Sequence, residues 1–299
     1  MKTLIGATLY LASIVSATQA ETLSEFFPEV YNDLSPEYQE ESNIFNFQQG
    51  QITLPGGAAT LNVGPNHYFI DADQAKLVVE EFWRNPKGQP FLGMIFPREI
   101  SPYYTGGWGL TVEFEDIGYV SDKEAADYNY DELLSTMQKD IVSESAWRKE
   151  NGFDRMELIG WAAPPRYDAQ ERKLHWAKHL RFGDSESDTL NYNIRALGRN
   201  GVLILNFIAN IDELPAVATA APEVMAMVSF TQGNRYADFK PGIDKVAAVG
   251  IGGLIAGKVI AKTGLLVTLL LVFKKAWFLI FIPIVWLKNK FSGRKDNIS

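Results

Sequence analysis

Alternation of apolar and polar residues dominates the middle of the chain. The segment RMELIGWAAPP is a strand-like run that ends in a proline pair, KLHWAKHLRF and LNYNIRAL place apolar residues at about every second position, and VLILNFIAN is apolar on both sides. A period of two is typical of a strand with one buried face, whereas an unbroken apolar run indicates a strand buried on both faces. The turn-forming segments GDSESD and GRNG separate the last three of these runs. The pattern predicts four successive strands between residues 155 and 210.

Helical patterns and a hairpin flank this group of strands. Asp71 followed by Gln74 is a capping box, which predicts the start of a helix. Further patterns predict helices over residues 130–151 and 214–230, and two β-rich runs around Pro55 predict a hairpin. Strands joined by tight turns, with helices before and after them, are typical of an α+β domain. We expect a mostly antiparallel sheet with flanking helices.

The N-terminus resembles an export signal. A lysine, a short apolar run and small residues precede Glu21, which is the pattern of a secretory signal peptide. The apolar run would rise only about 22 Å as a helix, which is short for a bilayer core of about 30 Å. We therefore predict a signal peptide over residues 1–20, cleaved after Ala20, and an extracytoplasmic domain over residues 21–245. A retained N-terminal anchor is the alternative.

A second apolar region, residues 246–287, precedes a basic tail at residues 288–299. As one helix the region would rise about 63 Å, twice what one crossing needs. It therefore predicts one crossing plus an interfacial stretch, or a hairpin. Positively charged flanks stay cytoplasmic, so an exported domain requires an odd number of crossings. We expect a C-terminal transmembrane helix in a bacterial inner membrane, with the main domain periplasmic and the C-terminus cytoplasmic.

Two lysines and a row of small residues mark this apolar region. Lys258 and Lys262 lie one helical turn apart, and their charges reach the cytoplasmic headgroups if the side chains extend along the helix. Gly253, Gly257 and Ala261 form a stripe of small residues, which lets two helices approach closely. The stripe predicts self-association of the membrane helix. Because such stripes are common in membrane helices, a plain anchor is the alternative.

Composition disfavours several classes of chemistry. The chain has no cysteine, which excludes disulfides, thiolate catalysis and cysteine-ligated metals. Nearly all of its 36 acidic residues lie within 21–245, so nucleic acid is not an expected partner of the domain. His175 and His179 lie in a strand-like segment, where four residues span about 13 Å, too far apart for one ion. We found no nucleophile elbow, phosphate-binding loop or metalloprotease motif, and we expect neither a metal nor a cofactor.

Polar residues interrupt the apolar strands. Asn191, Asn193 and Arg195 alternate along one strand, so they share a face and form a candidate groove with the segment GWAAPPRYD. Arg195 offers two parallel N–H donors to a carboxylate or phosphate. The alternative is a solvated sheet face, or an internal network that fixes strand register. The candidate ligand-binding residues are Trp161, Arg166, Tyr167, Asp168, Asn191, Asn193, Arg195 and Arg199, with Asn206 beside them.

Several segments together resemble one known family. They are LPGGAATLNV, GYVSDKEAADYNYDELL, GWAAPPRYD, LNYNIRALGRNGVLILN and GNRYADFKPGIDKVAAVGIGGLIAGK. They are similar to a bacterial, largely proteobacterial, family of membrane-anchored proteins classed as a domain of unknown function. The resemblance covers the chain from about Gln51 to Lys275. It implies a signal peptide, an extracytoplasmic domain and a C-terminal anchor, and it carries over no catalytic residue.

These observations favour a membrane-anchored periplasmic protein that acts by binding or as a scaffold. Its partners are membrane lipid and an envelope protein or another envelope component, such as a glycan or lipid headgroup. One alternative is an envelope-acting enzyme that uses a carboxylate and arginine site on the sheet face. Another is a homo-oligomeric membrane protein assembled through the glycine stripe.

Overall fold

The computed structural model describes residues 19–103, 106–125 and 128–257. The strands are β1 (Gln19–Glu21), β2 (Phe47–Thr53), β3 (Ala59–Val63), β4 (His67–Asp71), β5 (Phe91–Pro97), β6 (Gly109–Glu115), β7 (Met156–Asp168), β8 (Lys173–Phe182), β9 (Thr189–Leu197), β10 (Val202–Asn210) and β11 (Val228–Phe230). The helices are α1 (Leu23–Phe26), α2 (Pro28–Asp33), α3 (Pro36–Glu41), α4 (Ala72–Lys76), α5 (Tyr130–Glu150), α6 (Leu214–Met227) and α7 (Ile251–Ala256). Short helical turns are η1 (Ser42–Ile44), η2 (Leu77–Phe82), η3 (Ile211–Glu213) and η4 (Tyr236–Asp238).

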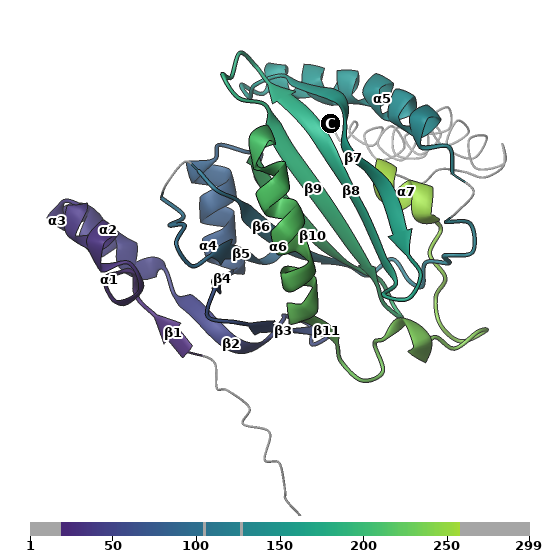
Figure 1. The fold of residues 1–299 in the computed structure, drawn as a ribbon, viewed down its shortest axis with the longest axis horizontal. Helices are drawn as coiled ribbons and strands as arrows, with labels where there is room; N and C mark the ends of the chain where they lie inside the picture. The colour runs from purple at the N-terminus through teal and green to yellow at the C-terminus, as the bar shows by residue number, and fades with distance from the viewer. Residues whose placement is uncertain (1–18, 104–105, 126–127, 258–299) are drawn as a thin grey trace, which may run out of the picture.

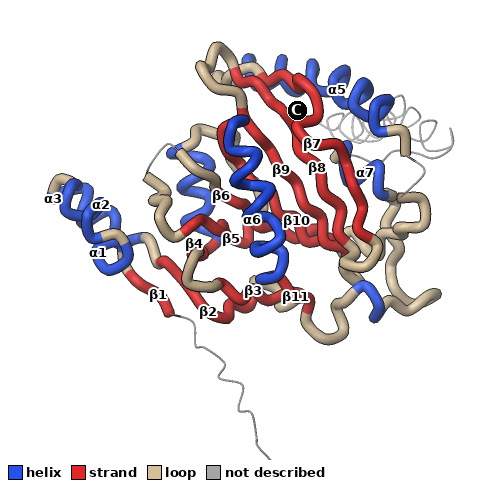
Figure 2. The backbone as a smooth tube through the Cα atoms, in the orientation of Figure 1, coloured by secondary structure: helices blue, strands red, loops and turns tan. Residues whose placement is uncertain are grey.

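A single sheet organises the described part of the chain (Figure 1). Its strand order is β11-β3-β2-β4-β5-β6-β10-β9-β8-β7, and β1 pairs with β2. Every ladder between these strands is antiparallel. The predicted meander is present as β7 to β10 (Figure 2), and β10 lies between β6 and β9, as expected for a strand that is apolar on both faces. The α+β fold on a mostly antiparallel sheet is confirmed.

Helix α6 covers one face of the sheet, which we call the α6 face (Figure 1). Val217, Ala221 and Val224 of α6 are buried in one apolar cluster with Leu205 and Phe207 of β10. These helix positions follow a spacing of four and three residues, so they form a single stripe. The stripe packs on the central strands and closes this side of the domain.

The opposite face, the α5 face, is covered in two separate places. At β4 and β5, Val78 beside α4 is buried with Tyr68 and Met94. At β7 and β8, side chains of α5 and α7 are buried with Leu158 and Trp176. The two apolar clusters share no residue. Between them, the face of β6, β10 and β9 carries polar side chains, which are described below.

Local capping explains where the first of these covering helices begins. The Asp71 carboxylate accepts hydrogen bonds from the backbone N–H groups of Asp73, at 3.0 Å, and Gln74, at 3.1 Å. This confirms the capping box predicted from the sequence. After Lys76 the helix continues as a π-helical turn, η2. That turn and the loop after it bring an aromatic side chain, Trp83, over the middle of the α5 face.

The predicted helix over residues 214–230 is too long by three residues. Helix α6 ends at Met227, and the next three residues form β11. Val228 lies opposite Leu61 and Phe230 lies opposite Ala59 on β3. The open edge of β3 therefore offers the backbone of these residues a strand partner, which the helical periodicity of the sequence does not reveal.

The start of the predicted membrane region packs on the domain. Ile251 and Leu254 of α7 are buried in the cluster that also contains Trp176. The helix ends at Gly257, whose φ of 68° is a left-handed conformation. Gly253 is buried and Gly257 ends the helix, so within the described residues these two do not form the continuous helix face that we predicted, and Ala261 lies outside these residues.

The two predicted membrane signals fall mostly outside the described residues. Residues 1–18 of the predicted signal peptide and residues 258–299 lie outside them, and Ala20 belongs to the short strand β1. No helix in the described part of the chain has the length and apolar character needed to cross a bilayer. The signal peptide and the C-terminal crossing therefore stay predictions.

Candidate functional site

Polar side chains gather on the α5 face of four neighbouring strands. Thr111 of β6 lies opposite Asn206 of β10, and Asn206 lies opposite Asn193 of β9. Residues paired directly across antiparallel strands point to the same face, as do residues two positions apart in one strand. The register extends this set along β6 and β9 and across to β8. We call it the polar strip, and it consists of Thr111, Glu113, Lys178, Asn191, Asn193, Arg195 and Asn206.

The polar strip differs sharply from the other side of the same strands. On the α6 face, Leu110, Ile194 and Phe207 are completely buried in the apolar core. Burying polar groups without partners is unfavourable, so a polar strip in the middle of a sheet requires hydrogen bonds, water or a ligand. Some polar groups of the strip, such as Arg195, have hydrogen-bond partners within it, whereas Lys178 has none among the described residues.

A cavity of about 880 Å³ lies above the polar strip. This volume falls within the range of small-molecule sites, about 300–1,000 Å³. The floor includes Lys178, Asn191 and Asn206. One wall comes from η2 and the loop that follows it, and the opposite wall comes from the C-terminal end of α5 and the nearby ends of β7 and β8. The wall side chains include Val79, Trp83, Arg84, Lys87, Glu144, Trp147, Arg148, Met156, Leu180 and Phe182.

Arg195 is held by neighbours in the polar strip. Its guanidinium donates to the Asn206 side-chain oxygen at 2.8 Å and to the Ile194 carbonyl at 3.0 Å, with a longer contact of 3.4 Å to Asn193. The same guanidinium lies 4.9 Å from the ring centre of Trp176, a cation–π contact. Burial lowers the pKa of Arg195 to about 10, against the opposing influence of Glu113. Arg195 therefore stays cationic at neutral pH.

Lys178 lies in the polar strip without a counter-ion. Its side chain lines the cavity, and it has no hydrogen-bond or ion-pair partner among the described residues. Burial, and to a smaller degree the positive charge of Arg195, lowers the pKa of Lys178 to about 8. Lysine ammonium groups are strongly hydrated and ordinarily face water or a carboxylate. The cavity therefore presents a cation that no anion of the described residues contacts.

The acidic residues around the cavity do not neutralise Lys178. Burial raises the pKa of Glu113, and its closest cationic influence is Arg195. Glu144 acts on Arg148, whose Nε donates to the Asp154 carbonyl at 2.8 Å. The Arg148 guanidinium also lies 5.2 Å from the ring centre of Phe182. Glu113 and Glu144 thus act electrostatically on arginines, and no carboxylate of the described chain forms an ion pair with Lys178.

The structure brings together part of the site predicted from the sequence. Asn191, Asn193 and Arg195 share the α5 face, as expected. Asn191 lines the cavity, Arg195 supports Asn206 from beside it, and the Asn193 amide donates to the Asn191 carbonyl at 2.7 Å. The internal-network alternative is therefore realised for Asn193 and Arg195, within a strip that also borders a cavity.

The remaining predicted residues lie elsewhere, so the predicted groove with GWAAPPRYD is not formed. Trp161 donates to the Tyr130 carbonyl at 3.3 Å, and Asp168 accepts from backbone N–H groups in its own turn. Arg166 is exposed opposite His175, and Arg199 pairs with Asp244 at the end of the meander. Bulges in β7 shift its register against β8, which alternation in the sequence does not reveal.

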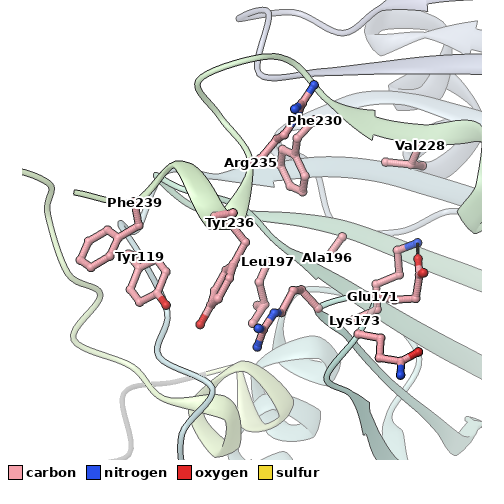
Figure 3. A pocket seen from close by; sticks show the side chains of 13 residues that line it. Tyr119, Glu171, Lys173, Ala196, Leu197, Val228, Phe230, Arg235, Tyr236 and Phe239 are labelled. Carbon is pink, nitrogen blue, oxygen red and sulfur yellow. Dashed lines mark hydrogen bonds and ion pairs between the residues drawn. The ribbon is translucent and has the colours of Figure 1, made fainter. Parts of the chain in front are cut away.

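A second pocket, of about 620 Å³, lies at the start of β8 and the end of β9 (Figure 3). Tyr119 stacks on Phe239 with ring centres 3.8 Å apart and also approaches Tyr236 at 4.6 Å. Beside them, the Asp122 carboxylate accepts from the hydroxyls of Tyr236, at 2.9 Å, and Tyr167, at 2.7 Å, and from Arg172. Tyr167 is therefore a structural donor, and Arg172 and Lys173 at this pocket are paired with Asp122 and Glu171.

The histidines do not form a metal centre with each other. His175 and His179 lie on β8, as their strand-like segment predicted, and His179 contacts Asp188 at 2.6 Å. His67, on β4, is buried with its Nδ1 3.6 Å from Glu223. No group of three or more candidate metal ligands is present in the part of the chain that the structure describes.

Comparison with known families gives a membership but not an activity. Residues 46–285 match the family described as Protein of unknown function (DUF2167). The chain belongs to this family. The match supports the resemblance drawn from the sequence, as far as a domain of unknown function. No match was found among curated proteins.

Two solved structures show weak likeness to this DUF2167 chain. One is cyanobacterial PsbP from Synechocystis sp. PCC 6803, which is 13% identical over 60% of this chain and 91% of its own, with a TM-score of 0.36. The other is the Ran-binding protein Mog1p of Saccharomyces cerevisiae, 12% identical over 66% of this chain and 100% of its own, with a TM-score of 0.33. Scores this low carry no argument about function.

Proposed function

We propose that this DUF2167 protein binds a small anionic molecule in the cavity above the polar strip. The observation that carries the proposal is the unpaired ammonium group of Lys178, which lines a cavity of about 880 Å³. A bound carboxylate or phosphate supplies the charge-assisted hydrogen bonds that Lys178 lacks within the described chain. Asn191 and Asn206 offer further polar contacts on the same floor.

The walls of the cavity favour a ligand with an apolar body. Trp83 and Trp147 lie on opposite sides, and Phe182 and Ile208 line the space between them. Small-molecule sites combine apolar and aromatic walls with a few polar groups that fix orientation. We therefore assign the anionic end of the ligand to Lys178 and its apolar body to the tryptophan walls.

A matched pair of probes tests this assignment. Full-length protein in lipid nanodiscs is titrated by calorimetry with 2-naphthoate and with its neutral isostere 2-naphthamide, using empty nanodiscs as the blank. Replacing Lys178 by methionine removes the charge and keeps the length. Because a hydrogen bond to a charged group contributes about 1.5–3 kcal/mol, we expect Lys178→Met to weaken naphthoate binding at least about tenfold and to leave naphthamide binding unchanged.

The control variant is Lys139→Met, which removes an exposed lysine of α5 away from the cavity lining. It keeps wild-type affinity for both probes if the cavity is the site. Equal affinity of wild type and Lys178→Met for naphthoate, or equal losses for both probes, would remove Lys178 from the account. Circular dichroism of each variant verifies that the domain is folded.

We further propose that the domain works outside the cytoplasm, anchored to the bacterial inner membrane by its C-terminal region. The apolar region 246–287 and the basic tail 288–299 support this placement, and so does the export signal at residues 1–20. The ligand is then an envelope component. Protease added to intact spheroplasts should digest the domain. Protection of the domain, with loss of only the basic tail, would reverse the proposed orientation.

A further inference from the structure

We propose that Lys178 reacts covalently with an anionic aldehyde or ketone, forming an imine in the cavity. This rests on the proposed function, because it requires the same cavity to admit an anionic molecule. It goes further by giving the ligand a carbonyl group and Lys178 a chemical role. A reactive lysine needs a free amine, space for the carbonyl compound and a means of holding it.

The geometry leaves the amine of Lys178 available. Its Cα lies opposite that of Asn191, whose side-chain oxygen already accepts from the Asn193 amide at 3.0 Å. The charged neighbour that acts on the Lys178 amine is a second cation, Arg195. A desolvated amine beside another cation is a recognised arrangement for a nucleophilic lysine.

Burial, and to a smaller degree the positive charge of Arg195, raises the share of neutral amine at Lys178. With its pKa at about 8, about half of Lys178 is neutral at pH 8. An ordinary exposed lysine is neutral at that pH in only about 1 molecule in 250. The titratable and charged residues that face the cavity are Arg84, Lys87, Glu113, Glu144, Arg148, Asp154 and Lys178 itself. None of the carboxylates among them pairs with Lys178 within the described chain.

A simple anion contacts the Lys178 ammonium, but in a molecule that also carries a carbonyl group the carbonyl carbon takes that place, and Arg148 is positioned to hold the anionic end. It lines the same cavity and is 7% exposed. Its Nε bonds to the Asp154 carbonyl, and no other hydrogen bond of its guanidinium is found among the described residues. The guanidinium stacks near Phe182, four residues along β8 from Lys178. One cavity therefore offers an amine for the carbonyl carbon and a separate guanidinium fork for the anion.

The reaction is balanced without an oxidant or reductant. The lone pair of the neutral Lys178 amine attacks the carbonyl carbon, forming a C–N bond while the C=O π electrons move to oxygen. Proton transfer from nitrogen to that oxygen gives a carbinolamine. Loss of the hydroxyl group as water, with the remaining N–H proton, leaves the imine. The sum is amine plus carbonyl compound giving imine plus water.

Pyridoxal 5′-phosphate is the probe, because it combines an aldehyde with a phosphate. Full-length protein is incubated with substoichiometric probe at pH 8, reduced with sodium cyanoborohydride, and digested for peptide mass spectrometry. We expect the reduced adduct to form on Lys178 at least about tenfold faster than on the exposed Lys139, in line with the difference in neutral amine. Prior addition of 2-naphthoate should protect Lys178 and leave Lys139 unchanged.

Variants separate this inference from the proposed function. Lys178→Arg removes the reactive amine and should abolish the fast adduct, whereas the control Lys139→Met should keep both naphthoate binding and the fast adduct on Lys178. Arg148→Gln should slow labelling of Lys178 by pyridoxal 5′-phosphate more than labelling by the uncharged aldehyde benzaldehyde. Naphthoate binding that depends on Lys178, together with adducts spread evenly over exposed lysines, overturns the imine and leaves the binding site standing. If adducts are spread evenly over exposed lysines and naphthoate affinity is also the same in wild type and Lys178→Met, both the imine and the proposed binding site are overturned.

Discussion

Replacing Lys178 by methionine should stabilise the unliganded protein. In the free protein the Lys178 ammonium lacks a counter-ion within the described chain and faces Arg195 as a like charge. Methionine has a similar length and no charge, so it removes the desolvation cost and keeps the apolar stem. A residue that lowers stability while lining a cavity is typical of a binding site.

The pKa of Lys178 sets the size of this effect. Burial lowers the pKa of the side chain from 10.5 to about 8. A tenfold change in a protonation constant corresponds to about 1.4 kcal/mol, so the charged lysine destabilises the fold by up to about 3 kcal/mol. Water that enters the cavity screens the charge. We therefore expect Lys178→Met to raise the free energy of unfolding by about 1–2 kcal/mol at pH 7.

The gain from Lys178→Met should depend on pH with a definite sign. Between pH 8 and 10.5 the folded wild-type protein has lost the Lys178 proton and the unfolded chain still holds it. Wild-type stability therefore rises with pH across this window. Below pH 8 the wild type carries the full penalty. The methionine variant lacks this titration, so the difference between the two proteins should close as the pH approaches 10.

Urea unfolding of detergent-solubilised protein, followed by tryptophan fluorescence, measures this difference. Lys139→Met is the control, because its side chain is exposed and its removal should change stability by less than about 0.5 kcal/mol. A free energy of unfolding that is lower by 1 kcal/mol or more in Lys178→Met than in the wild type at pH 7 would show that the ammonium has a favourable partner in the free protein. The reasoning about an unpaired cation would then be refuted.

Four other substitutions test the packing that surrounds the site. Asp122→Asn removes the charged acceptor of two tyrosines and an arginine, and should lower the free energy of unfolding by about 2 kcal/mol in urea titrations. Gly201→Ala places a Cβ 2.0 Å from the Glu115 carbonyl and should cost about 1–3 kcal/mol, whereas Gly160→Ala meets open space and should be close to neutral in the same assay. Ile251→Ala should lower the free energy of unfolding by about 2–5 kcal/mol if α7 packs on the domain in solution. A decrease of less than 0.5 kcal/mol would contradict that packing.

Regular features of the sheet could be predicted from the sequence. The meander from β7 to β10 follows from alternation in β8 and β9, an apolar run in β10 and short turns, because strand faces that are buried must be apolar. The capping box at Asp71 marked the start of α4 for a local reason, since its hydrogen bonds join residues two and three positions apart. β11 was missed because its pairing partner, β3, is distant in the sequence.

The site could be predicted only in part. Asn191, Asn193 and Arg195 were found because their alternation places them on one face. Lys178 was overlooked, although it interrupts the apolar face formed by Trp176 and Leu180 in KLHWAKHLRF. A lysine at an inward position is a detectable signal. Its lack of a counter-ion is a property of the packed structure, and no sequence pattern gives it.

The cavity itself depends on contacts between distant segments. Its walls come from residues near Trp83 and Trp147, and its floor comes from four strands. The sequence separation between the two tryptophans does not indicate that they line the same cavity. Neither did the apolar character of residues 246–257 indicate that α7 is buried against α5 and β8, because a membrane helix and a buried core helix have the same composition.

Proton linkage during anion binding tests the central claim most directly. If the bound carboxylate contacts the Lys178 ammonium, it raises the pKa of Lys178, and binding at pH 9 must take up a proton from the buffer. Calorimetric titration of the full-length protein with 2-naphthoate, repeated in buffers of different ionisation enthalpy, measures this uptake. The account predicts uptake approaching about one proton in the wild type at pH 9, and almost none at pH 6 or in Lys178→Arg. Binding at pH 9 without proton uptake, or with equal uptake in Lys178→Arg, would contradict it.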